Sequence, residues 1–301
     1  MNSDFKNYTI VSDSSCDLTD EIVLSNNIKI IPFFISYDGK TYLKEREELD
    51  IPSMYEKLVR ESNVFPKTAM PSVDDYVKCF TKELENNNDI ICICVSTKFS
   101  GSYNSALSAK QICLETYPNA RIEIIDSILI TGLQGLFVLE IVRMKKDGLT
   151  LDDIMEKVDE LKKSGRIYFT IGGLEYLIHG GRIGKLAGMV GASLKIKPII
   201  VLKEGELFSE GISFTRKKAA LKAISLAKEY FKKTKEDLNE YQLIVGYGYN
   251  KIEGENFYNK VCAEFNCTNI PLIQIGATIG VHTGPHPLGI GLIKKYEYIK
   301  K

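Results

Sequence analysis

Short apolar runs alternate with longer amphipathic stretches along almost the whole chain. The apolar runs predict strands, and stretches whose apolar residues recur three or four positions apart predict helices. The predicted strands cover residues 9–12, 28–36, 90–95, 122–125, 167–171, 196–202, 207–213, 242–246 and 272–275. The predicted helices cover residues 53–61, 73–84, 103–116, 135–146, 152–163, 215–233 and 255–265. Because strands that alternate with helices usually form a parallel sheet flanked by helices, the sequence predicts an α/β fold.

This alternation changes near residue 165. Glycines cluster between Gly172 and Gly191, and Lys203-Glu204-Gly205 predicts a tight turn between two adjacent strands. We therefore expect one domain over residues 8–297 that contains two subdomains. The first, residues 8–160, is built on a mainly parallel sheet with flanking helices. The second, residues 161–297, is an α/β subdomain with antiparallel strands.

Composition and charge argue against several classes of function. The 301 residues include 39 Lys and Arg and 39 Asp and Glu, so neither nucleic acid nor an anionic membrane is the expected partner. The longest nearly apolar run, residues 127–139, is shorter than the roughly 20 residues of a membrane span. The first residues lack the basic and apolar segments of a signal peptide. We therefore expect a cytoplasmic protein without stable membrane insertion.

Cysteine and histidine give no sign of a metal site. Cys262 and Cys267 are too far apart for a CxxC motif, and the chain contains only three histidines. The seven cysteines include several within apolar runs, and we expect buried, reduced thiols. Glu45, Glu47 and Glu48 are expected on a solvated segment.

Hydroxyl-bearing side chains gather where three predicted strands end, at residues 12–17, 96–102 and 126–127. In an open α/β sheet, the carboxyl ends of the strands form the ligand-binding edge. Each group by itself is explained by turns and helix caps. Together they also suit an anion site, in which hydroxyls and helix N-termini hold a carboxylate or phosphate.

Two motifs for catalysis fail on spacing. Residues 180–185 read GGRIGK, but Leu186 stands where a phosphate-binding loop needs Ser or Thr. Ser100 and His282 could in principle form a nucleophile and its base, yet the first glycine of a hydrolase elbow is missing. An enzyme, either a Ser/His hydrolase or a kinase of a small hydroxylated ketone, remains the alternative to a binding protein.

The stretch of residues 179–202 is rich in small side chains along a predicted short helix. These small residues are Gly184, Ala187, Gly188, Gly191 and Ala192. They either allow close helix packing or leave room for one wall of a tunnel.

Five segments together resemble the DegV family of bacterial fatty-acid-binding proteins. They are VSDSSCDLTDE (11–21), FPKTAMPSVDDY (65–76), VSTKFSGSYNSA (95–106), LEYLIHGGRIGKLAGMVGASLKIKPII (174–200) and IGVHTGPHPLGIG (279–291). The resemblance implies a lipid-binding protein that encloses one long-chain fatty acid in a tunnel between its two subdomains. It also implies the acyl-carrying subunit of a bacterial fatty-acid kinase, without a cofactor or catalytic activity of its own. A separate ATP-dependent kinase would phosphorylate the bound carboxylate for phospholipid metabolism.

The same resemblance assigns roles to individual residues. Thr68 and Ser100 would bind the fatty-acid carboxylate, and His282 would support them. Arg182 would face the kinase at the mouth of the site. The candidates for the tunnel lining are Gly184, Gly188 and Gly191.

Two departures from the family pattern concern the head-group pocket. The family often has Ser-Gln after the threonine that Thr68 matches, whereas this chain has Ala69-Met70. His286-Pro287 likewise replaces the small residues that are common in the family. Both departures affect the expected head-group contacts and leave the class of ligand unchanged.

Overall fold

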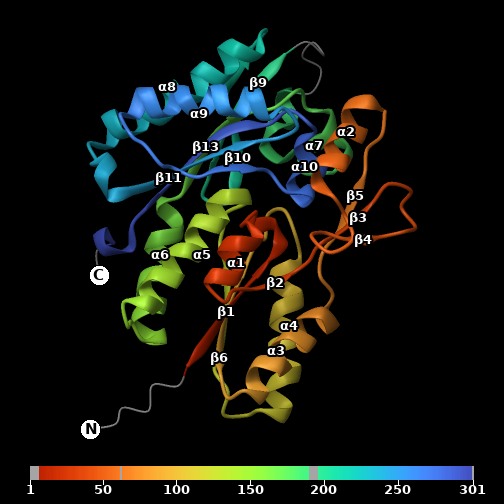
Figure 1. Ribbon diagram of the computed structural model, residues 1–301, viewed down its shortest axis with the longest axis vertical. Helices are drawn as coiled ribbons and strands as arrows, with labels where there is room; N and C mark the ends of the chain where they lie inside the picture. The colour runs from red at the N-terminus through yellow and green to blue at the C-terminus, as the bar shows by residue number, and fades with distance from the viewer. Residues whose placement is uncertain (1–6, 62, 190–195, 300–301) are drawn as a thin grey trace.

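The computed structural model describes residues 7–61, 63–189 and 196–299, which form three sheets and their covering helices (Figure 1). The first sheet is fully parallel, with the strand order β2-β1-β6-β7. Its strands are β1 (Tyr8–Asp13), β2 (Lys29–Ile31), β6 (Asp89–Cys94) and β7 (Ile122–Asp126). The predicted parallel sheet is therefore confirmed, and its carboxyl edge carries all three hydroxyl-rich segments.

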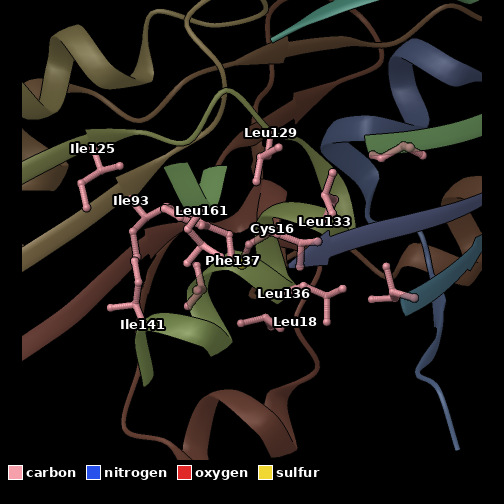
Figure 2. Close-up of a cluster of buried hydrophobic side chains, with 14 of the residues drawn as sticks. Cys16, Leu18, Ile93, Ile125, Leu129, Leu133, Leu136, Phe137, Ile141 and Leu161 are labelled. Carbon is pink, nitrogen blue, oxygen red and sulfur yellow. The ribbon is translucent and has the colours of Figure 1, made fainter. Parts of the chain in front are cut away.

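Helices cover both faces of this sheet because its strands are apolar on both sides. Cys92 and Cys94 of β6 pack toward α3 (Val73–Glu85) and α4 (Ser102–Thr116). Ile91 and Ile93, which alternate with them, pack toward α5 (Thr131–Lys146) and α6 (Leu151–Ser164). Figure 2 shows Ile93 beside Phe137 and Ile141 in this second core. The short helix α1 (Asp20–Ser25) lies on the same side as α5.

The second sheet has the strand order β10-β9-β8-β13-β11-β12, and only β11 and β12 are parallel. Its strands are β8 (Arg166–Thr170), β9 (Lys197–Lys203), β10 (Glu206–Ser213), β11 (Tyr241–Tyr247), β12 (Leu272–Gln274) and β13 (Leu288–Lys294). Glu204 and Gly205 form the predicted tight turn, with φ values of 52° and 79°. One face of the sheet packs on α8 (Arg216–Thr234) and α9 (Lys251–Phe265), and the other packs on α5 and α6.

A small third sheet, with the order β4-β3-β5, lies beside the first two (Figure 1). Its strands are β3 (Phe34–Ser36), β4 (Leu43–Lys44) and β5 (Lys67–Ala69). Ile35 of β3 and Tyr55 of α2 (Ile51–Arg60) pack against α10 (Ala277–Thr283). The Tyr55 hydroxyl also donates to the Ile275 carbonyl at 2.9 Å. This packing brings β5 next to α10, although the two are far apart in the sequence.

One predicted strand is wrong, and one predicted short helix takes a 3-10 form. The expected strand over residues 28–36 divides into β2 and β3, which belong to different sheets. Pro32 stands between them, and proline has no N–H group for a continuous ladder. The short helix expected near residues 184–192 is a 3-10 helix over Gly184–Met189, and residues 190–192 lie outside the described part of the chain. The two subdomains expected at residues 8–160 and 161–297 stay a prediction.

A buried carboxylate joins four elements at the carboxyl edge of the first sheet. Asp13, at the end of β1, is fully buried. Its Oδ2 accepts hydrogen bonds from the Val95 N–H and the Ser102 hydroxyl, both at 2.9 Å. Its Oδ1 accepts from the Ser15 hydroxyl at 2.6 Å and from Gln134 Nε2 at 3.0 Å. One side chain thus connects β1 to the end of β6, the start of α4 and the start of α5.

The Asp13→Asn variant should be less stable than the wild type by about 2–4 kcal/mol. Each carboxylate oxygen of Asp13 accepts two hydrogen bonds. In the variant, an NH2 group replaces one of these oxygens, and its two N–H donors would face the donors that are already there. Equilibrium unfolding in urea measures the difference. The control is Asp20→Asn, because the Asp20 side chain is 80% exposed. Equal stability of the two variants would contradict a structural role for Asp13.

Candidate functional site

A cavity of about 240 Å³, here called the head cavity, lies where the first sheet, the small sheet and α10 meet. Its polar lining comes from Thr68, Ser100, Arg182, Thr278, His282 and Thr283. Its apolar lining includes Phe33, Met70, Val95, Phe99, Phe169 and Leu177. The structure therefore brings Thr68, Ser100, Arg182 and His282 together around one space.

Thr68 and His282 form a hydrogen-bonded pair across this cavity. Thr68 lies on β5 and His282 on α10, and Thr68 Oγ1 is 2.9 Å from His282 Nε2. Burial, with a smaller contribution from the charge of Arg182, lowers the pKa of His282 to about 4, so the ring is neutral near pH 7. The buried Nδ1 has no hydrogen-bond partner among the described residues.

These facts assign the direction of the hydrogen bond. A buried N–H without a partner is rarer in proteins than a bare acceptor, so we place the ring proton on Nε2. Nε2 then donates to Thr68 Oγ1. The Thr68 hydroxyl proton is left free to point into the cavity and bind an anion there.

Ser100 stands beside the N-terminus of α4. The Ser102 N–H donates to Ser100 Oγ at 3.2 Å, which leaves the Ser100 hydroxyl proton available to a ligand. Gly101, the N-cap residue of α4, also lines the cavity and provides no side-chain cap. The partial positive charge at this helix end favours a bound carboxylate.

Arg182 is fixed by two backbone carbonyls. Its Nε donates to the Phe99 carbonyl at 3.0 Å, and one terminal nitrogen donates to the Gly180 carbonyl at 2.5 Å. Burial lowers the pKa of Arg182, but an arginine that starts above 12 stays charged. The guanidinium therefore supplies one positive charge at the edge of the head cavity.

A second space, here called the tail cavity, lies between the start of α5 and the second sheet, with a volume of about 40 Å³. It shares Ile130, Phe169, Ile279 and Thr283 with the head cavity, so the two spaces are neighbours. Its other lining residues are almost all apolar or glycine, among them Gly132, Ile244, Gly246, Ile273, Gly289 and Gly291. A cavity with several polar residues thus lies next to an almost wholly apolar one.

Glycines let the walls of the tail cavity pack closely together. A Cβ atom added to Gly132 would lie 2.4 Å from Ile273 Cδ1 and 2.7 Å from Ile244 Cδ1. Gly289 and Gly291 alternate along β13, so both leave the face toward α5 without a side chain. Sequence reasoning missed this wall. The signal was the sequence GIG at residues 289–291, where alternate glycines mark one bare face of a strand.

The glycine stretch that the sequence suggested as the lining lies elsewhere. Gly184 and Gly188 belong to the 3-10 helix over Gly184–Met189, which buries Leu186 and exposes both glycines. Neither glycine lines the head or the tail cavity, and a Cβ atom on either would meet no atom within 4 Å. Gly191 lies outside the described residues.

The two departures from the family pattern have different places. Met70 lines the head cavity and is 46% exposed, so it stands at the opening. A Cβ atom on Gly101 would lie 2.9 Å from Met70 Sδ, which places the thioether over the start of α4. Pro287 lines the tail cavity, whereas the His286 carbonyl accepts from Arg216 at 2.6 Å.

Two other chemistries find no support in the described residues. Across 7–61, 63–189 and 196–299, no three His, Cys, Asp or Glu side chains are placed to hold a metal ion. The hydrogen bond of His282 goes to Thr68 and not to Ser100, and no acid orients Nδ1 within those ranges. In the same part of the chain, no helix is both long and apolar enough to cross a bilayer.

Comparisons with known proteins identify the family. A family model described as an uncharacterised protein of the DegV family matches residues 7–295. A DegV domain-containing protein of Clostridium acetobutylicum is 31% identical over 290 residues, covering 95% of this chain and 98% of the relative.

Solved structures resemble the fold closely. A stearic acid-binding protein from Eubacterium ventriosum has a TM-score of 0.93 and 40% identity, covering 96% of this chain and 99% of that one. The fatty acid-binding protein DegV of Bacillus subtilis has a TM-score of 0.81 and 27% identity, covering 96% and 100%. The chain therefore belongs to the DegV family.

Proposed function

We propose that this protein binds one long-chain fatty acid, with the carboxylate at the polar residues of the head cavity and the chain running along its apolar wall toward the tail cavity, which would have to widen to hold the end of the chain. The observation that carries the proposal is the junction of the two spaces. Thr68 and Ser100 line a cavity that shares Ile130 and Phe169 with a neighbouring apolar one. The stearic acid-binding relative supports the same class of ligand.

The energetics suit such a ligand. A chain of roughly 16 methylenes stabilises the complex by about 13 kcal/mol when buried, at about 0.8 kcal/mol for each. Association costs roughly 4–15 kcal/mol, so the tail supplies the affinity. The hydroxyls replace water around the carboxylate and fix its orientation.

We further propose that the protein has no activity alone and presents the carboxylate to a separate ATP-dependent kinase, which forms an acyl phosphate. The chain carries no intact phosphate-binding loop, since Leu186 interrupts the one candidate. The head cavity opens beside the exposed Met70, which would give a partner access. Arg182, at the cavity edge, is the residue that we propose faces the kinase.

Native mass spectrometry of the purified protein tests the proposal directly. We expect one adduct with the mass of a long-chain fatty acid, because a buried tail dissociates slowly. A protein that carries no lipid and turns over ATP or an ester by itself would favour an enzyme instead.

The variants Ser100→Ala and Thr68→Val should each weaken stearate binding by about 1.5–3 kcal/mol, roughly 10- to 150-fold in Kd. Each change removes one charge-assisted hydrogen bond to the carboxylate. Titration with stearate measures the effect, and thermal unfolding checks that the fold survives. Ser209→Ala is the control, because Ser209 is exposed on β10 and lines neither cavity. Wild-type affinity in both test variants would refute the assigned head group.

The Gly246→Ala variant should shorten the longest fatty acid that the protein accepts. The new methyl group would enter the tail cavity at 3.3 Å from Ile275 Cγ1, a contact that a small shift of Ile275 relieves. A competition series of saturated acids from lauric to stearic acid measures the preference. The exposed Gly188, changed to Ala, is the control and should keep the wild-type preference. An unchanged preference in Gly246→Ala would place the tail elsewhere.

A further inference from the structure

Two buried carboxyl groups lie next to both cavities and have no part in the proposed binding of the head group. They belong to Asp17, which follows the 3-10 helix η1 (Ser14–Cys16), and to Glu45, which follows β4. Asp17 is 9% exposed and Glu45 is 1% exposed. Both line a separate pocket of about 380 Å³. We call these two residues the carboxyl pair.

The two carboxyl groups approach one point at the start of α10. A Cβ atom added to Gly276 would lie 2.3 Å from Asp17 Oδ1 and 2.9 Å from Glu45 Oε1. Only a residue without a side chain fits there, and Gly276 is the N-cap residue of α10. The geometry therefore keeps two acids close together against the end of one helix.

The hydrogen bonds of the pair are unequal. Glu45 accepts from the Thr278 N–H at 2.8 Å, from the Thr278 hydroxyl at 2.6 Å and from the Ser14 hydroxyl. Asp17 Oδ2 accepts from the Thr131 hydroxyl, whereas Asp17 Oδ1 has no well-formed hydrogen bond among the described residues and only the Gly276 amide nearby. Donors thus stabilise the charge of Glu45 better than that of Asp17, and Oδ1 of Asp17 is the atom that can take a proton.

The surroundings supply little positive charge. Within the described part of the chain, no lysine or arginine forms an ion pair with Asp17 or Glu45. Arg46, the nearest cation, donates to the Leu18 carbonyl at 2.6 Å and pairs with Asp20. The titratable and charged groups around the pair are Asp13, Cys16, Asp20, Arg46, Tyr55 and Tyr247.

The balance of these effects favours a proton on Asp17. Burial, followed by the charge of Glu45, raises the pKa of Asp17 to about 8. The Thr131 hydroxyl, the Gly276 amide and Arg46 oppose this shift only in part. Burial raises the pKa values of Cys16 and Tyr55 as well, so both stay neutral over the same range of pH.

Each member of the carboxyl pair holds one threonine of a cavity wall. Thr131, bound by Asp17, is the first residue of α5 and lines the tail cavity. Thr278, bound by Glu45, lies in α10 and lines the head cavity. Thr131 also has a φ of 51°, a strained value for a β-branched residue, so its position depends on such contacts.

We propose that the carboxyl pair is a proton-binding site that couples fatty-acid binding to proton uptake. With one proton on Asp17, the pair holds Thr131 and Thr278 in the binding arrangement. Loss of that proton leaves two adjacent negative charges, whose repulsion loosens both walls and weakens the ligand. The coupling rests on the proposed function, whereas the proton site itself does not.

The direction of the effect follows from linkage. The folded protein keeps a proton on Asp17 that the unfolded chain loses near pH 4, since its pKa rises from 3.8 to about 8 on folding. The contribution to stability is therefore full below the lower value and falls as the pH rises toward the higher one. A ligand that favours the protonated form must, by reciprocity, increase the affinity for the proton.

Calorimetric titration with oleate, below its micelle concentration, tests the coupling. We expect Kd to increase about five- to tenfold between pH 7 and pH 9, a usual size for coupled sites. Near pH 8, titrations in two buffers of different ionisation enthalpy should show net proton uptake. Asp17→Asn should lose both effects, because an amide keeps the shape but takes no proton. Asp20→Asn, an exposed acid of the same pocket, should retain both.

A second variant tests the direction in which the pKa of Asp17 should change. Glu45→Gln removes the neighbouring charge that raises the pKa of Asp17, so the midpoint of the pH dependence should move to lower pH. An Asp17→Asn protein with the wild-type pH dependence of Kd would overturn the coupling.

Unfolding without ligand separates this inference from the proposed function. Between pH 5 and pH 8, the Tm of the wild type should fall relative to that of Asp17→Asn. If oleate does not bind at any pH, the proposed function fails, and the Tm difference still tests the proton site. Parallel Tm curves for the two proteins would overturn the site even if oleate binds.

Discussion

The four hydrogen bonds of the Asp13 carboxylate hold the carboxyl edge of the first sheet together. They connect the end of β1 to the end of β6, to the start of α4 and to the side chain of Gln134 on α5. Ser100 lies between two of these attachments, at Val95 and Ser102. The position of its hydroxyl therefore depends on a buried charge that itself faces no ligand. Burial without such donors would cost several kcal/mol, which explains why hydroxyls crowd this edge.

The head cavity needs contributions from all three sheets. The first sheet supplies Ser100, the small sheet supplies Thr68 on β5, and α10 carries His282 next to the second sheet. Thr68 and His282 are 214 positions apart in the sequence, yet they share one hydrogen bond. The small sheet therefore places Thr68 next to α10, while the two larger sheets supply the apolar walls of the head cavity.

The sequence alone predicts the helices and strands that show a long, regular pattern of apolar residues. The strands of the first sheet and the helices α3 to α6 follow from apolar patterns, and the turn at Glu204 and Gly205 follows from its residue types. It does not predict β5, β13 or α10. β5 is too short to show a period, and the glycines that make β13 useful to the tail cavity also weaken its strand signal. The apolar residues on both sides of Pro32 hide the break between β2 and β3.

The candidate site divides in the same way. Thr68, Ser100, Arg182 and His282 could be chosen only through resemblance to a family, because no spacing joins positions so far apart. Gly184 and Gly188 belong to a stretch with many small residues, and such a stretch suggests a cavity lining. A glycine lines a cavity, however, only if the side of its Cα that lacks a side chain faces that cavity. Glu45, which the sequence places in solvent, is instead buried. Thr278 and Ser14 donate the hydrogen bonds that a buried carboxylate requires.

Helix α5 is packed on both of the larger sheets, and this has a consequence for how a ligand can enter. Ile93 of the first sheet, Phe137 of α5, and Phe169 and Ile244 of the second sheet belong to one continuous hydrophobic core (Figure 2 shows the part around Ile93 and Phe137). A hinge motion, in which the two larger sheets move apart as rigid bodies, would have to separate the side chains of this core. Access to the interior must therefore come from local motion of the segments that line the head cavity, while the shared core stays packed.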